Sequence, residues 1–136
     1  MNIAKLLKPI EILHSKDRIQ VCTTLYNLML GGYRHVIVLG DLDVPRCGID
    51  NKALKKMNLL RVGGSIDLCG NQLTSLKGMP EEVLKDANLS RNQISSLKSQ
   101  LCRVGGIMDL TDNCLRSLDG CPEDVGLEIK VGLNFI

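Results

Sequence analysis

The side chains best suited to chemistry in this chain are its six cysteines and two histidines, His14 and His35. A catalytic cysteine needs a neighbouring base or cation that lowers the pKa of its thiol, and a zinc site needs ligands at short, regular spacings. No Cys-x-x-Cys pair occurs, and neither Cys69 nor Cys121 has a histidine or a basic residue beside it. The sequence therefore predicts no metal site, no cofactor and no enzymatic activity, and a cysteine-dependent enzyme stays open as an alternative. The cysteines are Cys22, Cys47, Cys69, Cys102, Cys114 and Cys121.

Two glycine pairs, Gly63–Gly64 and Gly105–Gly106, raise the question of a phosphate-binding loop. Such a loop continues with Gly-Lys-Ser/Thr and opens a long helix, and neither feature follows here. Both pairs come directly before short apolar stretches. We therefore expect them to be tight corners that lead into strands, where glycine permits a positive φ.

Composition excludes further classes of function. A chain of 136 residues with 44% hydrophobic residues suits one domain with a real core. A net charge of +2, with no Trp, two Tyr and one Phe, provides neither the basic stripe nor the stacking aromatics of a nucleic-acid-binding domain. The apolar runs are too short to span a membrane, and no secretory signal pattern opens the chain. We expect a cytoplasmic protein, in a bacterial or a host cell, with reduced cysteines and with neither nucleic acid nor membrane as partner.

The chain repeats itself with a period of 21 residues. The stretches "IDLCGNQLTSL", "ANLSRNQISSL" and "MDLTDNCLRSL" begin at Ile66, Ala87 and Met108. Further upstream, "GDLDVPRCGI" aligns with "GSIDLCGNQL" at a step of 24 residues, which indicates a longer first turn. A period of this length is the signature of a solenoid. One asparagine recurs in each copy: Asn71, Asn92, Asn113 and Asn134.

The spacing has a physical reading. Ile66 and Leu68 alternate with Asp67, which is the pattern of a strand with one buried face. A strand this short is stable only when copies pair in parallel and each turn buries its leucines against the next. The repeated asparagine then lies where the chain leaves the strand, and its amide can satisfy main-chain groups that would otherwise be buried without partners.

The pattern L-x-L-x-x-N/C-x-L covers roughly residues 40–136 and resembles the leucine-rich repeat. Its short period and the stretch "NQLTSLKGMP" are similar to the bacterial and bacteriophage form of that family, which includes repeat arms of secreted effectors. The resemblance implies an α/β fold: a leucine-rich-repeat solenoid with short parallel strands on its concave face. It departs from the pattern at Cys47, in the asparagine position, and at Ala87, in place of a larger aliphatic residue.

Residues 1–34 do not follow the repeat and are expected to form an N-terminal α-helical cap. Ile3, Leu6, Leu7 and Ile10 have helical spacing interrupted by Pro9, and a second apolar stripe ends at Gly31–Gly32. The alternative is a separate helix that binds a partner or a membrane surface. Residues 35–136 are expected to form about four to five turns of solenoid, in one compact unit with the cap.

The candidate site is the concave face, where residues between the buried strand positions point outward. The notion of an acidic groove for a basic segment of a partner protein competes with the alternative that these residues only keep the sheet soluble. The resemblance suggests a non-catalytic interaction module, as an effector or a phage-encoded inhibitor that docks on a host protein. A homo-oligomeric scaffold, or homodimer, assembled through Phe135 and Ile136 at the C-terminal edge is the alternative function. The concave-face residues are Asp43, Ser65, Asp67, Asp86, Asn88, Ser90, Arg91, Asp109, Thr111, Asp112 and Lys130.

Overall fold

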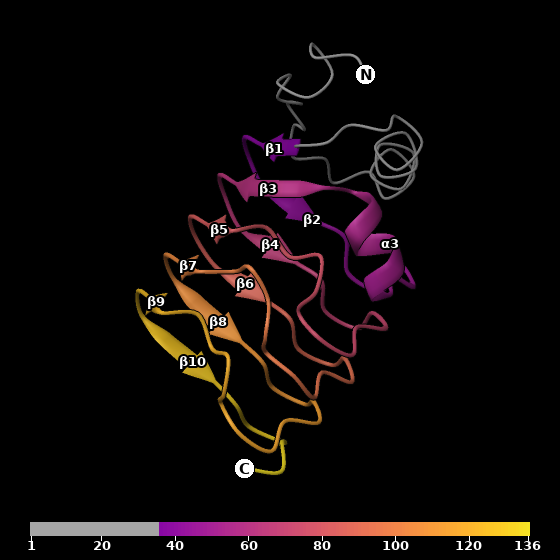
Figure 1. The fold of residues 1–136 in the computed structure, drawn as a ribbon, viewed down its shortest axis with the longest axis vertical. Helices are drawn as coiled ribbons and strands as arrows, with labels where there is room; N and C mark the ends of the chain where they lie inside the picture. The colour runs from indigo at the N-terminus through magenta and orange to yellow at the C-terminus, as the bar shows by residue number, and fades with distance from the viewer. Residues whose placement is uncertain (1–35) are drawn as a thin grey trace.

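The computed structural model describes residues 36–136, which form a β-solenoid of about five turns with parallel strands (Figure 1). Each turn contributes a strand to each of two five-stranded sheets. The first sheet contains, in spatial order, β1 (Val36–Val38), β3 (Leu59–Val62), β5 (Glu82–Val83), β7 (Arg103–Val104) and β9 (Asp124–Val125).

The second sheet is the one that the repeat predicts. It pairs each strand with the strand one period away, as in Ala87 with Met108 and Met108 with Ile129. Its strands, again in spatial order, are β2 (Leu42–Asp43), β4 (Ile66–Asp67), β6 (Ala87–Asn88), β8 (Ile107–Asp109) and β10 (Glu128–Lys130).

The first sheet is an addition to the strands that the sequence predicts for the concave face. Its strands precede the glycine corners, and the recurrence of Val83, Val104 and Val125 at 21-residue steps is its trace in the sequence. Strand β1, formed by the apolar stretch "VIV", also belongs to this first sheet. The remaining part of each turn is irregular, with the exception of one helix in the first turn.

That helix, α3 (Asn51–Lys56), explains the 24-residue first step. The carboxylate of Asp50 accepts a hydrogen bond from the Ala53 N–H at 2.8 Å and caps the helix N-terminus, and Leu54 anchors the helix in the core. The longer first turn is thereby confirmed. Because α3 is the only helix among residues 36–136, the described part is a β-solenoid and gives the expected α/β class little support. The expected helical cap at 1–34 lies outside the described residues.

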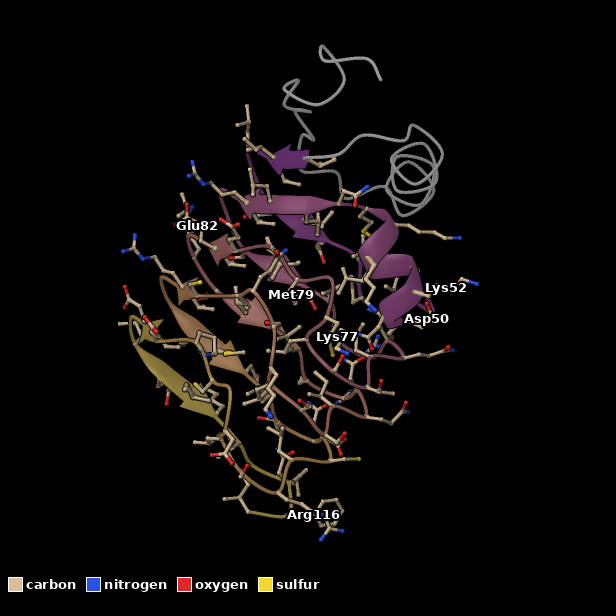
Figure 2. All side chains as sticks on the ribbon, in the orientation of Figure 1. Asp50, Lys52, Lys77, Met79, Glu82 and Arg116 are labelled. Atoms are coloured by element: carbon tan, nitrogen blue, oxygen red, sulfur yellow. The ribbon has the colours of Figure 1, made fainter. Side chains whose placement is uncertain are left out.

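The core is a stack of aliphatic layers. Met79 is fully buried inside the stack, whereas Lys52 and Lys77 lie on its surface (Figure 2). Equivalent positions of successive turns are buried together, so that each turn covers the one before it. Fully buried examples one period apart are Val83 and Val104, Leu68, Leu89 and Leu110, and Leu73, Ile94 and Leu115.

The asparagines join neighbouring turns, as the sequence predicts. The Asn92 side chain accepts a hydrogen bond from the Leu73 N–H at 3.0 Å and donates to the carbonyls of Leu68 and Leu89 at 3.0 and 3.1 Å. These main-chain groups are buried, so the amide replaces water that cannot reach them. Asn71, Asn113 and Asn134 make equivalent bonds in their turns.

The glycine corners have a different cause from the one expected. Gly105 and Gly106 do not have positive φ; they are instead pressed against the preceding turn. A Cβ on Gly105 would lie 2.0 Å from the Leu84 carbonyl oxygen, and one on Gly106 would lie 2.1 Å from Oδ1 of Asp86. The glycines therefore permit close approach of turns rather than an unusual backbone conformation.

Candidate functional site

The exposed side of the second sheet carries one row of polar residues, which we call the outer row. Strand pairing places each member beside the next, about 4.8 Å apart, as is normal for neighbouring strands. Asp43 and Lys130 at its two ends are exposed, and the three members between them are half-buried. The outer row consists of Asp43, Asp67, Asn88, Asp109 and Lys130.

Local hydrogen bonds hold the middle of the outer row in place. Oδ1 of Asp67 accepts from the Cys69 N–H at 2.9 Å, and Oδ1 of Asp109 accepts from the Thr111 N–H at 2.9 Å. Asn88 makes the same bond with its amide oxygen, to the Ser90 N–H at 3.1 Å. Each side chain thus has a fixed orientation, and an amide serves as well as a carboxylate for this purpose.

Asp43 differs from the other members. The residue two positions later is Pro45, which has no N–H to donate. Asp43 also lines a small depression of about 190 Å³ together with Asp41, Ser65 and Asp67. Asp41 was not among the predicted site residues, although it follows the corner and immediately precedes the strand, as Ser65 and Asp86 do. It adds a third carboxylate at this end of the row.

Ser65 and Asp86, the predicted site residues that precede the strands, accept hydrogen bonds from backbone N–H groups. Oγ of Ser65 accepts from the Asp86 N–H at 3.1 Å, and Oδ1 of Asp86 accepts from the Ile107 N–H at 2.8 Å. Asp41 makes the same contact with the Ser65 N–H at 2.7 Å. These side chains connect one corner to the next, and their position beside the outer row follows from that role.

The residues that follow the strands divide into two groups. Ser90 is buried, and its hydroxyl donates to Oδ1 of Asn88 at 2.6 Å, so it supports the outer row from beneath. Thr111 is half-buried. Arg91 and Asp112 are exposed and take left-handed φ values of 56° and 58° immediately before the asparagines. Of these four residues that follow the strands, Arg91 and Asp112 are therefore the most accessible to a partner.

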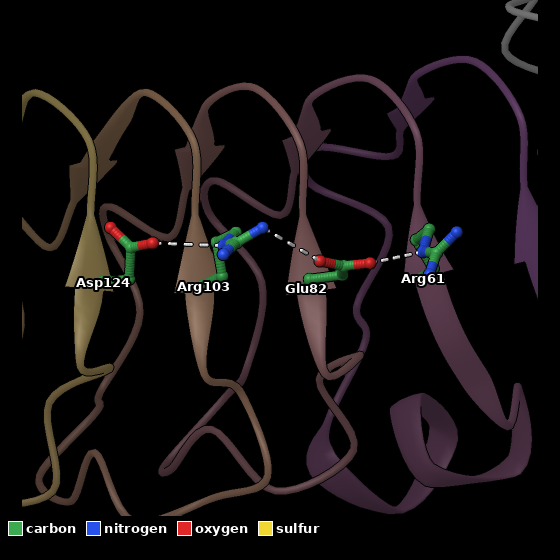
Figure 3. Close-up of polar contacts among 4 residues, drawn as sticks. All are labelled: Arg61, Glu82, Arg103 and Asp124. Carbon is green, nitrogen blue, oxygen red and sulfur yellow. Dashed lines mark hydrogen bonds and ion pairs between the residues drawn. The ribbon is translucent and has the colours of Figure 1, made fainter.

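The exposed side of the first sheet has a contrasting arrangement of charges. Arg61, Glu82, Arg103 and Asp124 occupy equivalent places in four successive turns and form a line of alternating charge (Figure 3). The Arg61 Nε lies 2.5 Å from the Glu82 carboxylate, and the Arg103 Nε lies 3.1 Å from the Asp124 carboxylate. Each of these four charges meets an opposite charge within the chain.

Among residues 36–136, neither Asp43 nor Asp67 of the outer row forms an ion pair. Asp43 and Asp67 are direct neighbours on paired strands, so like charges lie side by side. Such a neighbour pair costs roughly 0.2–1 kcal/mol of stability. The uncharged Asn88 separates this pair from Asp109. The row is therefore negative over most of its length and positive at Lys130.

Five cysteines lie in the described part of the chain. Cys69, Cys102, Cys114 and Cys121 are free thiols. Burial raises the pKa of the Cys121 thiol, which is opposite to what activates a nucleophile. Within residues 36–136, no three His, Cys, Asp or Glu side chains come together as a metal site would require. His14, His35 and Cys22 lie outside the described residues.

The last turn exposes apolar side chains at the C-terminal end of the stack. Phe135 and Ile136 are 67% and 63% exposed, whereas Leu115, one period before Ile136, is fully buried. The Arg116 guanidinium lies over the Phe135 ring, 5.8 Å from its centre. Arg116 itself is at this end of the molecule (Figure 2). The two residues predicted for the C-terminal edge are thus accessible.

Comparison with known proteins adds no relationship: no family model, no curated protein and no solved structure matches the chain. Among the residues described by the structure, there is no helix with the length and apolar character needed to cross a bilayer.

Proposed function

We propose that this chain is a non-catalytic protein interaction module that binds a basic segment of a partner protein along its outer row. The observation that carries this proposal is the contrast between the two exposed faces. Charges of the first sheet alternate and pair within the chain, whereas Asp43 and Asp67 of the second sheet are neighbours of like charge. The Asp67 carboxylate accepts a local bond from the Cys69 N–H, but Asn88 makes the equivalent bond without a charge, and a charge kept at a cost in stability is typical of a surface used for binding.

The dimensions of the row define the kind of segment that fits. From Asp43 to Asp109 there are three steps between paired strands, or about 14 Å at normal strand spacing. An extended peptide covers that distance with roughly four to five residues at about 3.3 Å each. A short segment with two or three Lys or Arg residues would therefore engage the carboxylates, and its negative neighbours would meet Lys130.

The finer assignment follows from the sequence pattern. We infer that the solenoid is of the leucine-rich-repeat type and that residues 1–34 complete it as a helical cap, which would make the whole chain α/β. The similarity to bacterial and bacteriophage repeats supports a role as an effector or phage-encoded inhibitor acting on a host protein in the cytoplasm. This part of the proposal is an argument from family likeness.

Neutralising the outer row without disturbing its backbone provides the test. The variant Asp43→Asn/Asp67→Asn/Asp109→Asn removes three charges. Asn88 shows that an amide can make the local hydrogen bond of this row. The matched control is Glu81→Gln, Asp119→Asn and Glu123→Gln, which removes three exposed charges away from the row. Twelve-residue peptides from a random display library, selected on the immobilised wild-type protein, serve as ligands.

We expect the selected peptides to be rich in Lys and Arg and to bind the control variant as they bind the wild type. The outer-row variant should bind them at least about tenfold more weakly, because charge-assisted contacts are lost at three places. Fluorescence anisotropy of labelled peptides measures both affinities. Peptides without basic residues, or equal binding to both variants, would contradict the proposal.

A further inference from the structure

The C-terminal end of the solenoid differs from its interior because no turn covers it in the described structure. β9 and β10 are the terminal strands of their sheets. Val83 and Val104 are fully buried and Leu110 likewise, but their counterparts Val125 and Val131 in the last turn are only partly buried. The apolar residues most exposed at this end are Leu118, Leu127, Leu133, Phe135 and Ile136.

The hydrogen-bond pattern of the inner turns shows which main-chain groups of β10 face this open end. The Ile66 N–H donates to the main-chain carbonyl of Asp86 in the next turn, and the Leu110 N–H donates to that of Lys130 in the next turn. Ile129 and Val131 occupy these places in the last turn. Since N–H and C=O of one strand residue point to the same side, both groups of Ile129 and Val131 point outward.

Leu127 adds one acceptor to this edge. The Gly64 carbonyl accepts from the Lys85 N–H of the next turn, and the Gly106 carbonyl accepts from the Leu127 N–H. Leu127 occupies the same place in the last turn that Gly64 and Gly106 occupy in their own turns. Its own N–H is used within the chain, and its carbonyl points to the open end.

The sequence of this edge, Leu127–Val131, reads Leu-Glu-Ile-Lys-Val and is self-complementary about its centre. In an antiparallel pairing centred on Ile129, Glu128 of one copy lies opposite Lys130 of the other, and Leu127 lies opposite Val131. Opposite charges in cross-strand positions attract, and aliphatic pairs pack. Glu128 and Lys130 are exposed, while Ile129 is partly buried, so charges and apolar groups fall on separate faces.

We propose that the partner of this end is a second copy of the chain, joined by antiparallel pairing of β10 with its equivalent. The outward main-chain groups match this register: the two Ile129 residues exchange N–H···O=C bonds, and each Val131 N–H meets the Leu127 carbonyl of the second copy. The two-fold axis is perpendicular to the second sheet, so both cores lie on the same side and their exposed apolar ends meet. This surface adjoins the outer row proposed above for partner binding and shares Lys130 with it.

A parallel, head-to-tail stack of β10 on β2 of the next copy is the competing arrangement. It sets Lys130 beside Asp43 and leads to open filaments, whereas the two-fold pairing closes after two copies. The two arrangements respond differently to an exchange of charges. Swapping Glu128 and Lys130 keeps opposite charges together in the antiparallel dimer but places a glutamate beside Asp43 in the head-to-tail stack.

Sedimentation velocity of the full chain and three variants tests the proposal. We expect wild type to form a dimer at about 100 μM, and Glu128→Lys to weaken association about tenfold, since it creates two like-charge pairs across the two-fold axis. Lys130→Glu should act in the same way. The double variant Glu128→Lys/Lys130→Glu should regain dimerisation to within about threefold of wild type.

Glu128→Lys is the cleaner single change, because it leaves Lys130 beside Asp109 within the chain. Thermal unfolding followed by circular dichroism checks that each variant is folded. A monomeric wild type, larger filaments in place of dimers, or a double variant that stays as weak as the single ones would each overturn the antiparallel dimer.

Discussion

The repeated asparagine stabilises the fold through a small number of hydrogen bonds between its side chain and buried main-chain groups. Asn71, Asn92 and Asn113 are between 4% and 7% exposed, and each contributes an acceptor and donors to backbone groups of two turns. Asn134 makes equivalent bonds in the last turn but is only partly buried. The same residue type in the same geometry is therefore exposed to water to different degrees, which allows its energetic role to be measured.

We expect Asn92→Ala to destabilise the fold by about 2–4 kcal/mol, because it leaves the buried Leu73 N–H without an acceptor. Asn134→Ala should cost only about 1 kcal/mol, because the Asn134 side chain is only partly buried and water can take its place beside the Leu115 N–H. Unfolding in urea, followed by circular dichroism, gives both values. Equal losses at the two positions would show that burial of the bond is not what matters.

At the scale of elements, the sequence predicts the second sheet well and the first sheet poorly. Ile66–Asp67–Leu68 and its copies carry a clear alternation, and the outer row lies on one face as that alternation requires. The first sheet consists mostly of strands of two residues, such as Arg103–Val104, which are too short to show a period. The recurrence of valine marked their place but not their conformation.

The alternation of buried and exposed residues also made the outline of the candidate site predictable. Alternation identifies which residues leave the core, but it does not show which polar atoms the backbone uses. Ser65 and Asp86 look like surface residues in the sequence and in fact bind the next corner. Asp41 was missed although the alignment of "GDLDVPRCGI" with "GSIDLCGNQL" places it at the position of Ser65, and its carboxylate lines the depression beside Asp43 and Asp67.

The corner glycines give a direct test at this scale. Gly105→Ala should destabilise the protein by about 1–3 kcal/mol, since the new Cβ would lie 2.0 Å from the Leu84 carbonyl oxygen and the backbone must move. Gly132→Ala is the matched control, because its Cβ would meet only the Thr111 methyl group at 3.8 Å. The control should change stability by less than about 0.5 kcal/mol. The urea midpoints of both variants measure these changes in stability. A Gly105→Ala variant as stable as the wild type would contradict the close-approach explanation.

At the scale of the whole molecule, stability in a solenoid is a sum over neighbouring turns. One complete period should therefore be removable. Deletion of residues 87–107 joins Asp86 to Met108, which is one period after Ala87 and follows a residue of the same place in the turn. We expect this chain to fold as a shorter solenoid. The deletion, however, also removes Arg103 and leaves Glu82 beside Asp124 on the first sheet.

This change in neighbours makes one substitution act in opposite directions in the two chains. In the full chain, Asp124→Arg replaces the 3.1 Å contact with Arg103 by a like-charge pair and should lower stability by a few tenths of a kcal/mol. In the shortened chain, the same Arg lies beside Glu82, so it should raise stability by a similar amount. Urea midpoints at low salt measure both effects, and about 1 M NaCl should reduce both by screening. A substitution with the same sign in both chains would show that the turns do not stack in the shortened chain as they do in the full one.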